Sequence, residues 1–247
     1  MKRVLPLLLC ASLFVLCFSG CAVVNFGFGN TNMVTGEGDL ESYEIKVGQF
    51  SKIRVDGYCD VNYYAASSDT VTLQIQPNLR EYYEVEVVRD ELVVRTKRGT
   101  STHAIKTPVL TVSAPVLTAV RIDGVSAFRA QDKIVADSLT ITIDGAGSGE
   151  AEIEVDRLTA EVDGVGSLSL SGTAANADLR LDGAGRLNAL SLQTKDAKVK
   201  LNGVGSISVS CSDNLTISAD GVGSVEYKGS PSIDLNKSGL ATIRKVS

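Results

Sequence analysis

Apolar and polar residues alternate along the chain from Ala119 onward, and a short glycine-rich phrase interrupts the alternation at regular intervals. Apolar side chains stand three and one residues before each interruption, and in most copies they return five and seven residues after it. An alternation with period two is typical of β-strands that bury one face. The sequence therefore predicts a series of half-buried strands joined by the same kind of turn.

The interrupting phrase is Asx-Gly-Val/Ala-Gly, with a degenerate last copy at Asn236. The Asx residues are 21, 19, 19, 20, 18 and 16 positions apart, and a nearly fixed period of this length is the signature of a solenoid with one coil per repeat. We expect the phrase to form structural corners, because glycine reaches positive φ and Asx side chains bond to nearby backbone. The corner pairs are Asp123-Gly124, Asp144-Gly145, Asp163-Gly164, Asp182-Gly183, Asn202-Gly203 and Asp220-Gly221.

Two all-β architectures are compatible with strands of this length. An Asp-Gly pair can close a two-residue hairpin, which would give a meander of antiparallel strands. A meander needs an equally strong turn signal halfway through each repeat, and those segments vary too much to supply one. The pattern therefore favours a parallel β-helix over residues 116–247, with its strands stacked coil on coil.

The first 20 residues resemble a signal peptide. Lys2 and Arg3 form a charged start, and residues 4–18 are apolar but too few to span a membrane with proper flanks. Small residues directly before Cys21 resemble a lipobox, so we expect a lipid on Cys21; an ordinary secretory signal is the alternative. An acylated Cys21 would anchor an exported lipoprotein to a membrane, most simply the outer membrane, with the side that it faces left open.

Residues 21–42 are glycine-rich and read as a flexible tether. Residues 43–115 are expected to form an N-terminal β-layer that contains a first coil, with Phe50, Ile53 and Val55 leading into Asp56-Gly57. The next Asp-Gly pair comes only at Asp123, and the gap holds four further strand patterns. We expect this layer to cap one end of the β-helix, because an open end would expose apolar interior and unpaired strand edges.

Charge and cysteine content narrow the range of partners. The net charge is −5, and without residues 1–20 the chain has 22 basic and 29 acidic residues, or −7. An acidic chain without tryptophan argues against nucleic acid as a partner. Beyond the signal segment and Cys21, only Cys59 and Cys211 remain. They lie in coils far apart, which favours two free thiols over a disulfide.

Catalytic chemistry has few candidate residues. His103 is the single histidine, and neither an HExxH nor a Gly-x-Ser-x-Gly motif is present. We therefore predict no enzyme activity, no catalytic residues and no cofactor, with a polysaccharide-active β-helix enzyme as the weaker alternative. The Asp residues of the corners could bind calcium, but Asn202 and Asn236 occupy the same column and bind metal poorly, so we predict no metal site.

A binding surface is the more plausible functional feature. Small polar residues follow each corner in register and should lie on one flat, rigid face that loses little side-chain entropy on contact. This face would bind a glycan or a surface protein; the basic loop Arg95–Lys106 is an alternative site, and a structural envelope protein without a ligand is an alternative function. The face is expected to contain Ser167, Ser169, Arg186, Asn188, Ser206 and Ser208.

Three stretches together resemble a known family of bacterial envelope proteins. They are the opening Phe50-Ser-Lys-Ile53-Arg-Val55-Asp-Gly57, the repeated Asp/Asn-Gly-Val/Ala-Gly-Ser, and the closing Gly229-Ser-Pro231-Ser-Ile with Gly239-Leu-Ala-Thr-Ile243. The family is the "putative auto-transporter adhesin, head GIN domain" family, and the resemblance covers about residues 43–244. It implies a β-helical, exported or lipid-anchored protein of Gram-negative bacteria, and it supplies no catalytic residues.

Overall fold

The computed structural model describes residues 33–247. The expected signal peptide, Cys21 and residues 21–32 of the expected tether lie outside the described residues. Within residues 33–247 the secondary structure is almost entirely β, and the one helix is the short 3₁₀ segment η1 (Pro77–Tyr82).

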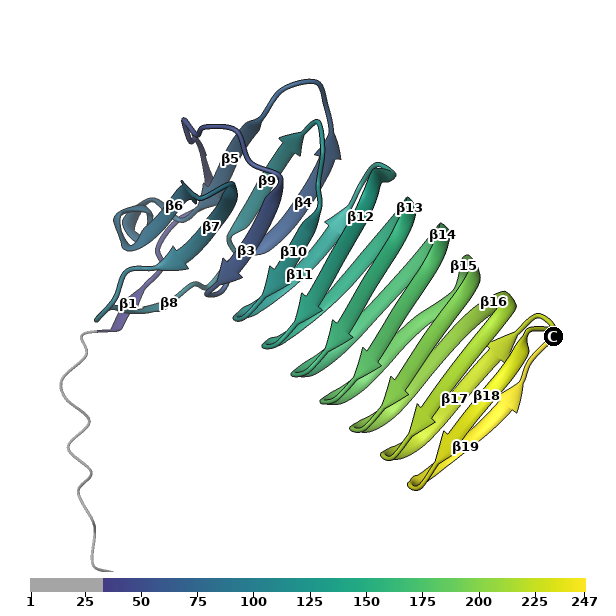
Figure 1. Ribbon diagram of the computed structural model, residues 1–247. Coiled ribbons are helices and arrows are strands. Elements are labelled where there is room, and N and C mark those ends of the chain that lie inside the picture. Colours follow the sequence, from purple (N-terminus) through teal and green to yellow (C-terminus); the bar gives the residue numbers. More distant parts are fainter. Residues whose placement is uncertain (1–32) are drawn as a thin grey trace, which may run out of the picture. The chain divides into compact units, whose positions relative to one another are not determined.

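Residues 119–245 form a parallel β-helix, as the repeat period predicts (Figure 1). Each strand pairs in parallel with the strand one coil further along, so the alternative of an antiparallel meander is wrong for this region. The strands are β10 (Ala119–Ile122), β11 (Val125–Ala130), β12 (Ile134–Ile143), β13 (Ala146–Val162), β14 (Val165–Leu181), β15 (Ala184–Leu201), β16 (Val204–Ala219), β17 (Val222–Lys228), β18 (Ser232–Lys237) and β19 (Leu240–Lys245).

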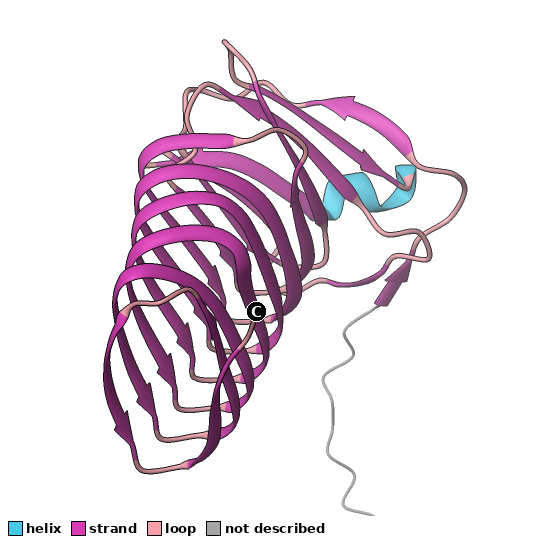
Figure 2. Cartoon of the chain, turned by 90° about the vertical axis from the view of Figure 1, so that its right-hand side faces the viewer, coloured by secondary structure: helices cyan, strands magenta, loops and turns pink. Residues whose placement is uncertain are grey.

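In the central coils, β13 to β16 each run without a break from one Asx-Gly corner to the next and curve over on the far side of the coil (Figure 2). Equivalent residues meet across coils: Leu168 pairs with Leu187, and Leu187 pairs with Ile207. All three are fully buried. Each such side chain contributes roughly 1.5–3 kcal/mol when it leaves water, but it does so only between two neighbouring coils.

The N-terminal part adds two further coils and a cap. Strands β3 and β4 form the expected first coil; this coil lies between β10 and β11 on one side and β7 and β9 on the other. The order of coils in space therefore differs from their order along the chain. The strands are β1 (Met33–Thr35), β2 (Glu41–Glu44), β3 (Lys52–Asp56), β4 (Asp60–Ala65), β5 (Thr70–Ile75), β6 (Tyr83–Val88), β7 (Glu91–Thr96), β8 (Ser101–His103) and β9 (Val109–Ala114).

Antiparallel strands close this end of the β-helix. Strand β6 pairs with β7, and β5 pairs with both β9 and β2. Residues 33–42, expected within the tether, include β1 and the start of β2. The side chain of Asn78 holds them to η1, because it donates to the Thr35 carbonyl (2.8 Å) and accepts from the Glu37 amide (2.9 Å).

The two glycines of each corner serve different purposes. The second adopts the predicted positive φ in three corners, at Gly185, Gly205 and Gly223 (φ +157°, +149° and +144°), whereas the first does not, so the prediction is wrong for the first glycine. Instead, corners stack backbone on backbone: the amides of Asp163 and Gly164 both donate to the Ile143 carbonyl, each at 3.0 Å. A Cβ on Gly164 would lie 1.9 Å from the Gly145 carbonyl oxygen. Glycine is therefore required because neighbouring coils leave no room for a side chain.

Candidate functional site

The Asx side chains of successive corners form a column on the outside of the coils. Arginines neutralise the aspartates at the capped end of this column. Arg54 lies 2.7 Å from Asp123, and Arg121 forms salt bridges with both Asp123 and Asp144. Further along, the Asn202 amide donates to Asp182 at 2.5 Å, and the Ser238 hydroxyl donates to Asp220. The expected bonds from Asx side chains to local backbone are not among the contacts at these corners, so the capping role is wrong. The side chains bond along the column instead.

Asp163 is the exception in this column. Among residues 33–247 no side chain donates a hydrogen bond or forms a salt bridge to it, whereas Asp182 and Asp220 accept hydrogen bonds. Carboxylate oxygens of Glu161, Asp163 and Asp182 all lie within 4.8 Å of one another. Burial by the surrounding residues, reinforced by the charges of Glu161, Asp144 and Asp182, raises the pKa of Asp163 to about 6. Such a group of carboxylates could hold a cation. The expectation that it holds none stays a prediction.

The structure brings the six residues of the predicted binding face together in two adjacent columns. Ser167 pairs with Arg186, which pairs with Ser206; two residues further on, Ser169 pairs with Asn188, which pairs with Ser208. Ser208 differs from expectation because its exposed fraction is only 8%. It lies between the longer side chains of Asn188 and Glu226. It therefore cannot contribute a free contact surface.

A polar hollow of about 470 Å³ lies on this face. Its floor has short side chains, including Ser169, Ser171 and Ser191, whereas the coils nearer the cap carry long charged ones. The difference in side-chain length between neighbouring coils is what creates the hollow. The long side chains at its edge are Arg129, Lys133, Glu150 and Glu152.

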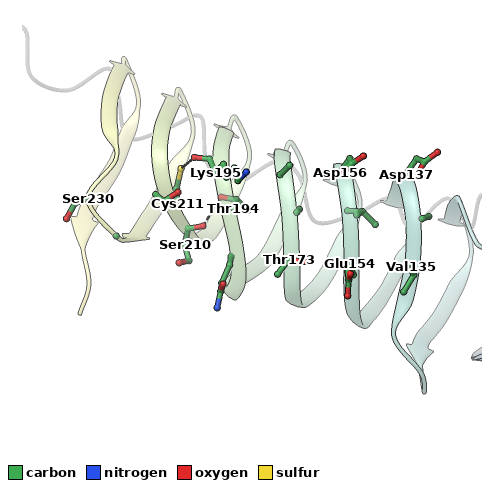
Figure 3. Close-up of a pocket in the computed structure, with 17 residues that line it drawn as sticks. Val135, Asp137, Glu154, Asp156, Thr173, Thr194, Lys195, Ser210, Cys211 and Ser230 are labelled. Carbon is green, nitrogen blue, oxygen red and sulfur yellow. Dashed lines mark hydrogen bonds between the residues drawn. The ribbon is translucent and has the colours of Figure 1, made fainter.

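The opposite bend of the coils carries a longer groove, of about 1170 Å³, which the sequence did not predict (Figure 3). Its floor is the column Ala136, Val155, Ala174, Thr194 and Cys211, which is mostly buried. The residues on either side of each floor residue form the two walls. Figure 3 shows one row with Asp137, Asp156 and Lys195 and another with Val135, Glu154 and Thr173. The only sequence signal was a small or apolar residue at the equivalent position of each coil. Its neighbours are not uniformly polar, since Val135 precedes Ala136 and Ala175 follows Ala174.

The basic loop is partly neutralised by acidic neighbours. Arg95 bonds to Glu84 (2.8 Å) and Glu86 (2.6 Å), and Lys106 bonds to Asp39. Residues 101–103 of the loop form β8, which pairs with β1, and His103 is exposed there. These contacts give the loop a structural role and leave fewer free charges for an anionic ligand.

Both remaining cysteines are free and buried. Five coil spacings separate β4, which follows Cys59, from β16, which contains Cys211, or roughly 24 Å at the usual strand spacing. A disulfide requires Cα atoms within about 7 Å. Burial raises the pKa of Cys59 to about 12 and also raises that of Cys211, so neither thiol is activated as a nucleophile.

Comparison with known proteins identifies the architecture. A crystal structure of a "putative adhesin" from Bacteroides fragilis covers 86% of this chain and 100% of its own, with 25% identity and a TM-score of 0.83. A "putative adhesin" and a "putative lipid binding protein" from Parabacteroides distasonis, 23% and 22% identical, each cover 87% of this chain and 100% of their own, with TM-scores of 0.66 and 0.65. A search of curated proteins gave no match.

No helix among residues 33–247 is long and apolar enough to cross a membrane. The model of one protein family matches residues 49–231, which include the first coil, the cap and most of the repeats. The chain therefore belongs to the family described as "putative auto-transporter adhesin, head GIN domain".

Proposed function

We propose that this protein is a non-enzymatic binding module of the cell envelope, an adhesin that uses the rigid side of its β-helix. The observation that carries the proposal is the polar hollow on the serine face, where Ser169, Ser171 and Asn188 are held by strands that pair on both sides. A partner meeting such a surface orders few side chains, and the charged edge of the hollow supplies hydrogen-bond donors and acceptors.

The ligand proposed for this face is a glycan or a protein on another surface. The family name and the adhesin among the similar structures support adhesion as the class of function. The residues near the hollow are carboxylates, basic side chains and hydroxyls, without a histidine or a buried nucleophile. Such a set is suited to recognition by hydrogen bonds.

A double substitution tests the role of the hollow. Ser169→Arg with Ser171→Arg should fill it, because both new side chains would extend beside Glu150 and Glu152. We expect loss of adhesion to surfaces that the unchanged full chain recognises. Asn176→Arg with Thr216→Arg, two exposed positions outside the hollow, is the matched control. Full adhesion by the first variant, with an unchanged melting temperature, would rule out this face.

We further propose that Cys21 carries a lipid and that the protein is exported and anchored, most simply in the outer membrane. Two or more acyl chains suffice for stable anchoring. Cys21→Ala should move the protein from the membrane fraction to the soluble fraction and abolish labelling by a fatty-acid analogue. Labelling that survives the substitution would contradict the lipoprotein assignment while leaving the binding proposal intact.

A further inference from the structure

The groove on the opposite bend of the coils, whose floor is the column from Ala136 to Cys211, is called the far-bend groove here. It runs across the strands, along the direction in which the coils stack. Residues from six successive coils line it, from Val135 on β12 to Ser230 after β17. At the usual strand spacing of about 4.8 Å, the equivalent positions of these coils span about 24 Å. A ligand that fills the groove must therefore be long and narrow.

The groove combines apolar and polar groups. The side chains of Val155 and Ala174 on its floor are almost fully buried in the core, so the apolar groups that the groove exposes are those of Val135, Ala136 and Ala175. The walls carry hydroxyl, amide and carboxylate groups, and Asp137 and Asp156 lie near the capped end. Exposed apolar side chains beside hydrogen-bonding groups match a chain of sugars, whose rings have apolar C–H faces and hydroxyl rims.

An extended peptide fits this groove less well. Peptides that bind to sheets gain affinity by adding a strand at a free edge. Here the strands of the central coils already pair with the coil on each side, so the groove offers no free backbone edge. The backbone of a bound peptide would lose water without gaining ladder partners, whereas a glycan needs only side-chain partners.

The charge of the walls selects among glycans. Asp137, Glu154 and Asp156 line the capped half, whereas Lys195 is the one cation among the groove's lining residues within the described chain. Polymers of acidic sugars would meet repulsion over that half of the groove. Sugar units in an extended chain repeat at nearly the distance between neighbouring coils. Successive sugars of a neutral chain can therefore each lie beside the same position of successive coils.

From this geometry we propose that the far-bend groove binds a neutral linear polysaccharide, with about one sugar per coil. This site shares no lining residue with the polar hollow, and it extends the proposed binding function to a second surface. The two surfaces can therefore be tested separately.

The length dependence of binding tests the proposal. Neutral oligosaccharides of two to eight sugars, from the cello-, manno- and chito-series, are titrated into the full chain by calorimetry, with hexagalacturonate as the acidic comparison. Affinity for at least one neutral series should rise up to about six sugars and then level off, and hexagalacturonate should bind about tenfold more weakly or not at all. Absence of binding in every neutral series, a plateau at two sugars, or tighter binding of hexagalacturonate would overturn the proposal.

A substitution in the middle coil locates the site. Thr173→Arg with Ala175→Arg places a long side chain on each wall, one residue either side of Ala174, and divides the groove into two halves. The affinity gain beyond about three sugars should then disappear, with an unchanged melting temperature. Asn176→Arg with Thr216→Arg, two exposed positions outside both the groove and the hollow, should keep the full length dependence. Should the hollow variant lose oligosaccharide binding and the groove variant keep it, the groove assignment is wrong and the proposed function at the hollow stands.

Discussion

Gly164 shows how little space the corners leave for side chains. The carbonyl oxygen of Gly145 would lie 1.9 Å from a Cβ at this position, and the same crowding recurs at Gly203, where the distance to Gly183 is also 1.9 Å. The clash is with backbone, so no side-chain rotation can relieve it.

Gly164→Ala should therefore destabilise the protein by about 1–3 kcal/mol, the range for forcing extra atoms into a packed site. Chemical denaturation with the linear extrapolation method measures the change. Gly48→Ala is the control, because a Cβ at Gly48 would meet nothing within 4 Å and its φ is not positive. Equal stability of the two variants would mean that the corners can separate to accommodate a side chain.

Asp163 makes the stability of the folded protein depend on pH, in a direction that follows from its raised pKa. Because its pKa is raised to about 6 in the folded state, the folded protein holds this proton more tightly than the unfolded chain. Its stabilising contribution is complete below the unfolded pKa of about 3.9 and is lost as the pH rises through about 6.

Asp163→Asn should therefore raise the melting temperature at pH 7 and have little effect near pH 4. The gain should be about 1 kcal/mol or less, since more than a third of the side chain is exposed and solvent screens the repulsion. Asp137→Asn, which removes an exposed carboxylate outside the column, is the matched control. A variant that melts lower at pH 7 would indicate that the carboxylate is stabilised by a cation.

The prediction that the corners hold no metal ion can be tested at the same carboxylates. If Glu161, Asp163 and Asp182 hold no ion, neither EDTA nor added calcium should shift the melting temperature at pH 7. A calcium-dependent increase that Asp163→Asn abolishes would show that the cluster is a metal site.

At the scale of elements, the hairpin between β6 and β7 is locally strained. Arg89 and Asp90 have φ values of +51° and +70°, the left-handed region that asparagine and glycine tolerate best in two-residue hairpins. Asp90 also anchors the first coil, because it accepts a hydrogen bond from the Ser51 hydroxyl at 2.7 Å. Arg89 has no such contact among the described hydrogen bonds.

Arg89→Asn should stabilise the protein by about 0.5–1 kcal/mol, because it relieves the backbone conformation without removing a contact. Thermal and denaturant unfolding both report the change. Arg98→Asn, in a turn without positive φ at that residue, should be neutral. A loss of stability in Arg89→Asn would show that the arginine side chain contributes more than its backbone costs.

The elements that the sequence predicted are those whose signal is local. Period-two alternation predicted the strands around Leu92 and Val109, and the repeated corner predicted every coil from Asp123 onward. Strand β1 and helix η1 were not predicted, because the contacts that hold them, such as Asn78 to the Thr35 carbonyl, join residues 43 positions apart.

Across the described chain, the candidate sites were predictable only in part. Periodicity aligned Ser169 with Asn188, and the structure has them as register partners. The periodicity of the sequence could not show that Asn188 and Glu226 cover Ser208, because that depends on side-chain length in two other coils. The groove escaped prediction for a similar reason: a depression along Ala174 is a property of six stacked coils and not of any one of them.

The position of the coil formed by β3 and β4 bears on how the molecule is assembled. This coil comes first along the chain, yet it lies between the coil of β7 and β9 and the coil of β10 and β11. A chain that emerges amino terminus first therefore completes its closed end before any repeat is made. Every later coil then adds to a finished template at a single growing edge. This order of coils permits assembly in one direction from the closed end, as a filament elongates from a preformed seed.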